Sequence, residues 1–253
     1  MEEEFQALSK QKQEQMLKLV THSFYKELKN YGVDSSDIVT VSVNLLDHIT
    51  NADSINSNGT EYYNNLFKID DIKDEWEKKG QLSIKDVQIK PLLGNQIAQV
   101  CEWLKISNIG STFIGQFPKD EIRLADYLIE KGDHKYFSIN SHNNAFVGVI
   151  GAENIDHNFK KLEMKKFIGN LDYQGKGIGK LATFLFLYFT FIKMKFNKVY
   201  IHSMDTNIKN INLNSKFGFG LEGILYGEVL LDNKFHDVLR MGLLRNTWTE
   251  IFS

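Results

Sequence analysis

A short glycine-rich stretch joins a strand-like segment to an apolar helix, and it limits the fold more than any other part of the chain. Residues 173–180 read Tyr-Gln-Gly-Lys-Gly-Ile-Gly-Lys, with a glycine at every second position from 175. Glycine lets the backbone turn tightly and approach a ligand without a Cβ atom in the way. The N–H groups at the start of the following helix bind an anion well. The stretch therefore predicts a strand, an anion-binding turn and a helix in succession, with pyrophosphate as a suitable ligand.

Two well-known phosphate loops do not fit this spacing. The dinucleotide fingerprint is G-x-G-x-x-G with an acidic residue about 20 positions further on, whereas this chain has G-x-G-x-G and Lys-Met-Lys-Phe at 193–196. The nucleotide-triphosphate loop needs a glycine and a hydroxyl residue where this chain has Gln174 and Leu181. On these residues alone, a glycine-rich turn without a ligand stays open as the alternative.

The composition indicates a globular chain whose two parts differ in charge. Of 253 residues, 42% are hydrophobic and 25% charged, which suits one large domain or a domain with an appendage. Up to Asn95 there are 11 Lys or Arg against 16 Asp or Glu, a net charge of −5, and the rest has 19 against 16, a net charge of +3. A mildly basic second part suits an anionic ligand. Neither part has the strong basic excess of a nucleic-acid-binding domain, so we expect no nucleic-acid partner.

Cysteine content and apolar segments predict a cytoplasmic location. Cys101 is the only cysteine, so no disulfide can form within the chain and a reducing compartment is expected. The first residues, Met-Glu-Glu-Glu, lack the charged-then-apolar order of a signal peptide. The apolar run at 181–192 is well short of the roughly 20 residues that cross a bilayer. It predicts a buried helix, and we expect no membrane partner.

The first 80 residues are expected to form a small helical domain of unknown role. Apolar residues recur at helical spacing over 4–30 and 39–49, and short helices are expected at 61–67 and 70–79. Such a domain would support dimerisation, giving a homodimer, or cover the substrate. The turn at Asp34-Ser35 also resembles the attachment turn of acyl carrier proteins, although Asp-Ser before a helix is common capping chemistry.

From residue 81 to 253, strands and helices alternate, which predicts an α+β domain. Strands are expected at 84–89, 136–139, 146–152, 162–170, 198–204, 225–231 and 235–243, and helices at 96–104, 119–130, 177–194 and 208–217. The result would be a mixed sheet with one unit of strand, glycine loop and helix near its centre.

Four motifs in this order resemble the GNAT superfamily of acyl-CoA-dependent N-acyltransferases, over about residues 82–247. Q-G-K-G-I-G at 174–179 resembles the loop by which that family binds the pyrophosphate of coenzyme A. D-T-N at 205–207, with Asn210 and Leu213 after it, resembles the helix start beside the pantetheine arm. K-F-G-F-G-L-E-G at 216–223 resembles the end of that helix, and D-V-L-R-M at 237–241 with Trp248 resembles the last strand. The resemblance implies a GNAT-type, mostly antiparallel sheet flanked by helices.

The resemblance also implies acetyl-CoA as the co-substrate and no metal. The acetyl group would pass directly to a primary amine without a covalent enzyme intermediate. Strand pairing in this family is splayed around residues 167–171, where Gly169 and Asn170 suit a bulge. The residues expected to bind acetyl-CoA are Phe167, Ile168, Gly169, Gln174, Gly175, Lys176, Gly177, Ile178, Gly179, Lys180, Asn207 and Asn210.

Further segments bear on the acceptor amine. Residues 134–137, 146–149, 204–209 and 235–239 resemble amino-sugar N-acetyltransferases, which act on a nucleotide-linked 4-amino-4,6-dideoxy sugar on the route to pseudaminic-type acids and surface glycans. A UDP-linked amino sugar is therefore the main hypothesis. Because ribosomal-protein and polyamine acetyltransferases use similar motifs, a protein N-terminus or a polyamine is the alternative. An acyl-CoA-binding sensor without catalysis is a hypothesis from another class.

Direct transfer needs a base for the proton of the amine. Glu163 and Glu153 both lie on strands predicted to border the amine site, and Glu163 ranks first. Glu153, His202 and His236 are the alternatives, and a relay through water is equally suitable. Trp103 and Phe113 lie where members of the family shape the acceptor pocket.

The departing thiolate needs an acid or must leave unprotonated. Many GNAT enzymes have a tyrosine as this acid at the position that Asn214 occupies here. An amide cannot give up a proton at neutral pH. Asn214 would then only position the sulfur, with Ser215 or Tyr226 as the acid, or the thiolate leaves without one.

Overall fold

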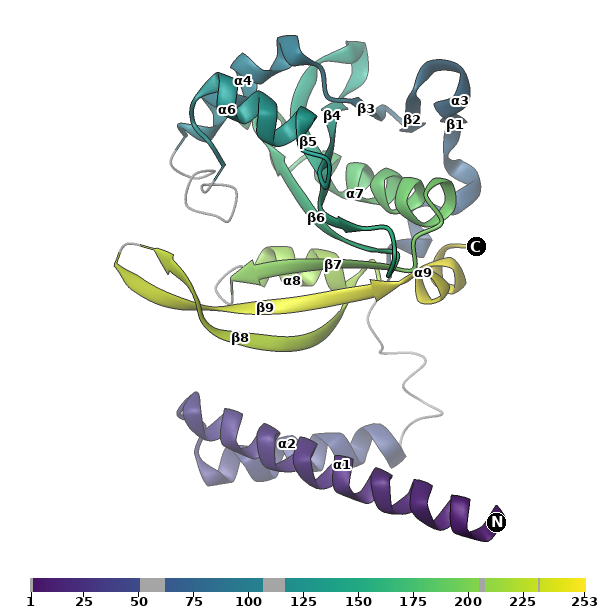
Figure 1. Cartoon of the computed structure of the whole chain (residues 1–253), viewed down its shortest axis with the longest axis vertical. Helices are drawn as coiled ribbons and strands as arrows, with labels where there is room; N and C mark the ends of the chain where they lie inside the picture. Colours follow the sequence, from purple (N-terminus) through teal and green to yellow (C-terminus); the bar gives the residue numbers. More distant parts are fainter. Residues whose placement is uncertain (1, 51–61, 107–116, 205–207, 232) are drawn as a thin grey trace. The chain divides into compact units, whose positions relative to one another are not determined.

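The computed structural model describes residues 2–50, 62–106, 117–204, 208–231 and 233–253 (Figure 1). The chain divides into two compact units, Met1–Gly59 and Thr60–Ser253.

Two helices make up the described part of the N-terminal unit, α1 (Glu2–Asn30) and α2 (Ser35–Thr50). The carboxylate of Asp34 accepts hydrogen bonds from the backbone N–H groups of Ser36 at 2.9 Å and Asp37 at 3.1 Å. It thereby caps α2, because the first N–H groups of a helix have no partner within the helix. Both predicted helices are confirmed, and capping accounts for the Asp-Ser sequence. The role of this unit, dimerisation included, stays a prediction.

Residues 62–80 belong to the second unit, which corrects the predicted helical domain over 1–80. They form 3₁₀ turns at Tyr63–Asn65 and Ile69–Asp71, strand β1 (Lys73–Glu75) and a single helical turn, α3 (Trp76–Lys79). Phe67 is 2% exposed, and its ring packs against those of Phe184 and Phe252. Burial of this ring and pairing of β1 outweigh the weak helical preference of a short polar segment. The boundary between the units falls after Gly59 instead.

The second unit contains a nine-stranded sheet within the described residues, in the order β1-β2-β3-β4-β5-β6-β7-β9-β8. The further strands are β2 (Gln81–Ile84), β3 (Val87–Pro91), β4 (Lys135–Asn140), β5 (Phe146–Asp156), β6 (Lys161–Ile168), β7 (Lys198–Met204), β8 (Gly220–Leu231) and β9 (Lys234–Leu244). Neighbouring strands are antiparallel except β6 and β7, which are parallel. The predicted α+β class and the mixed, mostly antiparallel sheet are confirmed.

One predicted strand is wrong. The segment 84–89 is divided by a turn at Lys85 and Asp86, with Lys85 at a φ of +51°. It therefore belongs to two antiparallel strands, β2 and β3. The two adjacent charged residues inside an apolar alternation are the signal for a turn that the periodicity alone does not show.

Helices cover both faces of the sheet. On one face lie α4 (Ile97–Leu104) and α6 (Glu121–Ala125), the latter extended by a π-helical turn at Asp126–Glu130. On the other lies α7 (Ile178–Tyr188), extended by a π-helical turn at Phe189–Lys193; α8 (Ile208–Ser215) follows β7, and α9 (Arg245–Phe252) follows β9. The adjacent β5 residues Val149 and Ile150 belong to different cores, Val149 with Trp103 of α4 and Ile150 with Phe186 of α7. Successive side chains of a strand point to opposite faces, so α4 and α7 lie on opposite sides of the sheet.

The two central strands separate partway along their length. The parallel ladder joins β6 to β7 at three positions, of which Glu163 opposite Tyr200 is the last. Beyond it β6 stays paired with β5 up to Ile168, while β7 stays paired with β9 up to Met204. Figure 1 shows β6 turning away with β5 while β7 runs along β9. The two strands therefore diverge beyond Glu163, and this divergence of β6 from β7 is here called the splay, as the resemblance implied.

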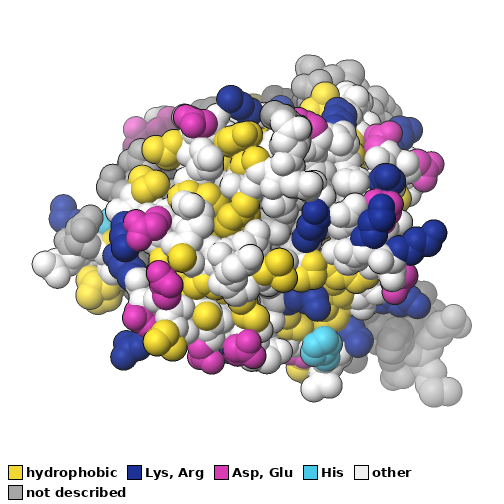
Figure 2. Space-filling view, turned by 90° about the horizontal axis from the view of Figure 1, so that it is seen from above, with side chains coloured by type: hydrophobic (Ala, Val, Ile, Leu, Met, Phe, Trp, Pro, Cys, Tyr) yellow, Lys and Arg dark blue, Asp and Glu magenta, His cyan; other side chains and the backbone are white. Residues whose placement is uncertain are grey.

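The surface shown in Figure 2 carries basic and acidic side chains interspersed around apolar groups. None of the helices in the described part of the chain is long and apolar enough to cross a membrane. Over the same residues, no group of three or more His, Cys, Asp or Glu side chains is arranged to hold a metal ion.

Candidate functional site

The glycine loop forms the start of α7. Gly175 and Gly177 have φ values of +73° and +80°, in the left-handed region that glycine adopts most readily. Gly177 precedes the first helical residue, and its carbonyl accepts hydrogen bonds from the N–H groups of Lys180 and Leu181. The N–H groups of residues 177–179 precede those bonds and are suited to a ligand. In α7, every residue of which is described, the first turn holds no acidic side chain that would repel an anion.

Side chains around the loop fix it and add positive charge. Gln174 Nε2 donates to the backbone carbonyl at the end of β6 at 2.8 Å. The ammonium groups of Lys176 and Lys180 lie 5.4 Å and 4.3 Å from the ring centres of Tyr173 and Tyr63. Cation–π contacts of this kind hold an ammonium in place without neutralising it. An anion in front of α7 would therefore have backbone donors and two cations within reach.

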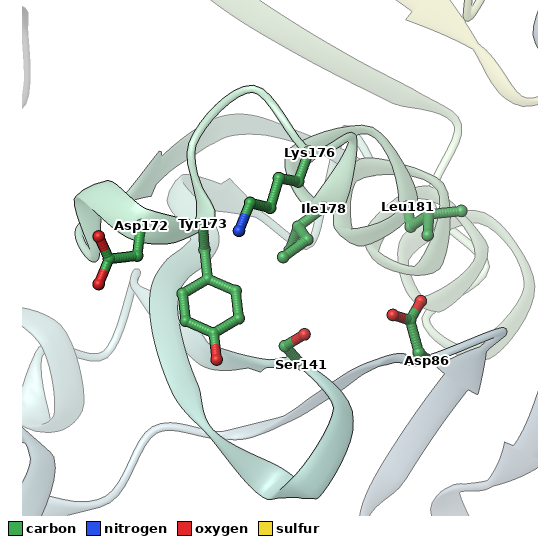
Figure 3. Close-up of a pocket in the computed structure, with 7 residues that line it drawn as sticks. All are labelled: Asp86, Ser141, Asp172, Tyr173, Lys176, Ile178 and Leu181. Atoms are coloured by element: carbon green, nitrogen blue, oxygen red, sulfur yellow. The ribbon is translucent and has the colours of Figure 1, made fainter.

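A pocket of about 320 Å³ opens beside the loop (Figure 3). It is lined by Asp86, Ser141, Asp172, Tyr173, Lys176, Ile178 and Leu181. Figure 3 shows the Lys176 ammonium pointing toward Tyr173, with the two carboxylates at opposite ends of the group. Two carboxylates and one ammonium suit a polar or cationic group better than a phosphate. The phosphate-binding features lie in the loop itself.

The end of β6 is irregular where the bulge is predicted. The N–H groups of Gly169 and Asn170 both donate to the carbonyl of Val147, at 2.9 Å and 3.1 Å. A Cβ atom on Gly169 would lie 2.0 Å from the indole of Trp103, so only glycine fits there. Trp103, on α4, is 6% exposed and packs within the core on the α4 side of the sheet.

Phe167 and Ile168 border the splay from opposite faces. The Phe167 ring packs edge-on against Trp103, and the Ile168 side chain packs with the core on the α7 side. Beyond Glu163 no pairing joins β6 to β7 in the described strands. Since a strand directs alternate N–H and C=O groups to each side, β6 can offer backbone hydrogen bonds to a ligand in the splay.

A lysine that the sequence analysis did not single out lies on the α7 side of the splay. Lys166 Nζ donates to Thr183 Oγ1 at 2.8 Å and to Asn214 Oδ1 at 3.2 Å. Burial lowers the pKa of Lys166 to about 7. Leu162, Met164, Lys166 and Ile168 alternate along β6, so a lysine in an otherwise apolar row is the signal that could have found it.

Glu163 is held in an ion-pair cluster on the opposite face. Its carboxylate accepts hydrogen bonds from His202 Nδ1 at 3.0 Å and Asn154 Nδ2 at 2.9 Å, and it pairs with the Lys165 ammonium. Burial alone would raise the pKa of Glu163, but the bonds from His202 and Lys165 outweigh it and hold the pKa at about 2. A carboxylate only accepts hydrogen bonds, so Nδ1 of His202 carries a proton. In neutral His202 the acceptor is then Nε2, a buried atom with no hydrogen-bond partner among the described residues.

The other candidate bases are placed differently. Glu153 is buried and accepts hydrogen bonds from the hydroxyls of Tyr127 and Tyr136. Burial, and then the charge of Glu153, raises the pKa of Tyr136 well above its ordinary value. His236 lies on β9 opposite Val229, beyond the position at which β9 leaves β7.

The candidate acids also differ in position. Asn214 is 1% exposed and contacts Lys166. The Ser215 hydroxyl donates to the carbonyl of Asn212 within α8, and Tyr226 is 50% exposed on β8. Asn210 lies on α8. Asn207 and Phe113 lie outside the described residues.

Part of the second unit is similar to known acetyltransferases. Residues 98–220 match the family model described as an acetyltransferase (GNAT) domain. Spermidine N(1)-acetyltransferase of Escherichia coli K12 is 27% identical over 101 residues, which are 40% of this chain and 54% of that protein. An uncharacterised, SPbeta prophage-derived N-acetyltransferase of Bacillus subtilis, YokL, is 26% identical over 133 residues, 51% of this chain and 73% of that protein. The matched segment thus spans about half the length of the spermidine acetyltransferase.

Solved structures show the same fold. Spermidine N-acetyltransferase of Vibrio cholerae in complex with CoA and spermine superposes with a TM-score of 0.59 at 22% identity, over 64% of this chain and 98% of that chain. A dodecameric structure of the Vibrio cholerae enzyme gives a TM-score of 0.56 at 20% identity, over 64% and 96%. The sheet with its splay and the glycine loop at the start of α7 agree with these structures: the chain has the GNAT fold, and residues 98–220 match the GNAT acetyltransferase model.

Proposed function

We propose that this protein is an acetyl-CoA-dependent N-acetyltransferase that acetylates a small primary amine, with a polyamine such as spermidine as the first acceptor candidate. The observation that carries the proposal is the glycine loop at the start of α7, next to the splay between β6 and β7. In a GNAT fold this arrangement suits a long anionic thioester, with its phosphates at the loop and its reactive end between the strands.

In this proposal the loop and the splay bind different parts of acetyl-CoA. The N–H groups of 177–179 take the pyrophosphate, and Lys176 and Lys180 add charge. Gln174 keeps the loop against the end of β6. The end of β6 around residues 167–169 borders the pantetheine arm, with Asn210 of α8 beside it, and Asn207 stays a contact predicted from its motif.

His202 is the proposed base, with Glu163 as its positioning residue. Glu163 binds the Nδ1 proton of His202 and so leaves the Nε2 lone pair to accept a proton from the amine. A carboxyl group with a pKa of about 2 is a poor acceptor for an ammonium proton. His202 therefore replaces Glu163, which the sequence ranks first, as the candidate base.

The polyamine is preferred because relatives named as spermidine acetyltransferases match this chain in sequence and in fold. A nucleotide-linked 4-amino sugar is the second candidate, on the sequence resemblance of residues 134–137 and 235–239. The two acceptors differ in charge, since spermidine is a polycation and the nucleotide sugar an anion. Salt should therefore weaken the binding of both acceptors, by screening acidic residues for spermidine and basic residues for the nucleotide sugar.

The test is thiol release from acetyl-CoA, followed with a thiol-reactive dye, in the presence of spermidine, a UDP-linked 4-amino sugar or a basic N-terminal peptide. Release with spermidine and a product heavier by one acetyl group would support the proposal. Thiol release with the amino sugar alone would make the amino sugar the acceptor in place of spermidine, and the proposed acetyl transfer would stand. Acetyl-CoA binding by calorimetry without release with any amine would overturn the enzymatic function and leave an acyl-CoA-binding protein.

A further inference from the structure

The Lys166 ammonium connects the anion-binding helix to the helix that follows β7. It hydrogen-bonds to Thr183 of α7 and Asn214 of α8. The Thr183 hydroxyl in turn donates at 2.7 Å to the carbonyl of Gly179, in the first turn of α7. The ammonium therefore lies one hydrogen-bonded side chain away from the glycine loop, on the strand segment that has left β7.

The surroundings of Lys166 do not balance its charge. Its two hydrogen-bond partners, Thr183 and Asn214, are neutral, and burial is the cause of its lowered pKa. The neighbouring Lys165 points to the other face and pairs with Glu163. A purely structural role at this position would be met by an apolar side chain, as at Leu162 and Met164 in the same row of β6. The ammonium is thus suited to an anion that arrives during the reaction.

Asn214 provides a second donor in the same place. Because Oδ1 accepts from Lys166, the amide Nδ2 faces elsewhere, and this buried atom has no hydrogen-bond partner among the described residues. Asn214 is 1% exposed, so water does not readily satisfy the group. An incoming sulfur or oxygen atom with negative charge beside Asn214 would find an unpartnered amide donor, with the Lys166 ammonium on the oxygen side of the same amide.

We propose that Lys166 is the acid that protonates the departing thiolate of coenzyme A, with Asn214 donating a hydrogen bond to the same sulfur. This inference rests on the proposed function. The amine nitrogen forms a bond to the acetyl carbon, and the carbon–sulfur bond breaks with its electron pair on sulfur. Lys166 Nζ gives a proton to the sulfur and becomes a neutral amine, while the proton lost by the acceptor passes to His202 Nε2. Exchange with water returns both residues to their starting states.

The first test compares three substitutions in the whole chain. Lys166→Met keeps the length of the side chain and removes the proton, Lys166→Arg keeps a charge that cannot be given up at neutral pH, and Lys161→Met is the matched control on the same strand. With spermidine and acetyl-CoA, we expect kcat to fall at least 100-fold for Lys166→Met and for Lys166→Arg, the usual scale for loss of a general acid. The Kd for CoA should change by less than threefold, and Lys161→Met should behave as the unaltered protein.

The outcomes separate this inference from the proposed function. If the unaltered protein turns over an amine and Lys166→Met keeps kcat within threefold, Lys166 is not the acid, although the enzyme assignment stands. Full activity of Lys166→Arg would show that charge, and not proton transfer, is needed, and would also overturn the inference. Should Lys166→Met fail to fold, Lys166→Gln takes its place, and a kcat within threefold of the unaltered protein again excludes Lys166 as the acid.

A second measurement does not depend on turnover. In protein labelled with ¹³C at lysine Cε, the Lys166 signal should titrate near pH 7 and shift when CoA binds. The signal is assigned by its loss in Lys166→Met. A Lys166 signal that titrates near pH 10 and ignores CoA would count against a proton donor at this position.

Discussion

The hydrogen bonds and the ion pair of Glu163 predict how the free energy of unfolding depends on pH. The pKa of Glu163 is about 2 in the folded protein, against an ordinary 4.5. At a pH where Glu163 is ionised in both the folded and the unfolded chain, this difference stabilises the fold by about 3 kcal/mol. Because the folded pKa is the lower one, this stability is complete above the unfolded pKa. It is lost as the pH falls toward 2, since the unfolded chain binds the proton first. Between pH 5 and pH 3 the linkage relation gives a loss of about 2 kcal/mol from this one group.

The perturbation is Glu163→Gln, which removes the charge and keeps the shape. Urea unfolding at pH 5, 4 and 3 gives the free energy of unfolding of both proteins, and other carboxylates cancel in the difference. We expect the advantage of the unaltered protein over Glu163→Gln to shrink by about 2 kcal/mol from pH 5 to pH 3. The control is Glu102→Gln, which removes an exposed ion pair with Lys105 and should leave the pH dependence unchanged. Parallel curves for Glu163→Gln, within about 0.5 kcal/mol, would refute the idea that the cluster holds this carboxylate ionised.

Three further substitutions follow from the site. His202→Asn keeps a donor for Glu163 but has no basic nitrogen, so kcat should fall about 100-fold at an unchanged Kd for acetyl-CoA; equal rates would exclude His202 as the base. Gly177 has a φ of +80° and open space around it, so Gly177→Ala should cost about 1 kcal/mol of stability through backbone strain and should weaken CoA binding in calorimetry. The control is Gly94→Ala, which also meets no neighbouring atom and should not affect binding. Gly169→Ala should destabilise by about 2 kcal/mol because the new Cβ meets Trp103, and in urea unfolding Trp103→Leu should offset part of that loss; simple additivity of the two changes would contradict the contact.

The glycine loop and most strands and helices could be predicted because their signals are local. Three glycines at alternate positions, followed by an apolar helix, define the start of α7 without knowledge of the rest of the chain. Residues 62–80 are predicted as two helices but form short turns and a strand, because the burial of Phe67 depends on Phe184 and Phe252, both far away in the sequence. Short segments of this kind take their conformation from such contacts and not from their own preferences.

The side-chain clusters were harder to predict, for a related reason. His202 and Glu163 meet because the parallel register places Glu163 opposite Tyr200, two residues before His202. The sequence favours Glu163 as a base because it does not show how many donors surround that carboxylate in the folded chain. Likewise the motif around Asn214 predicts a functional position, whereas Lys166, 48 positions earlier, meets Asn214 only through the packing of β6 with α7 and α8.

The segment 62–80 also determines where this protein could exchange its N-terminus. The Phe67 ring fills space between α7 and α9. The Tyr63 N–H donates to the carbonyl of Lys216 at 3.0 Å, and the Tyr63 ring forms a cation–π contact with the Lys180 ammonium. A gene fusion or recombination event that replaced everything before residue 81 would leave a cavity in the core and release a lysine of the glycine loop. A junction before Thr60 would spare both, so α1 and α2 are the part that could be gained, lost or replaced without rebuilding the sheet.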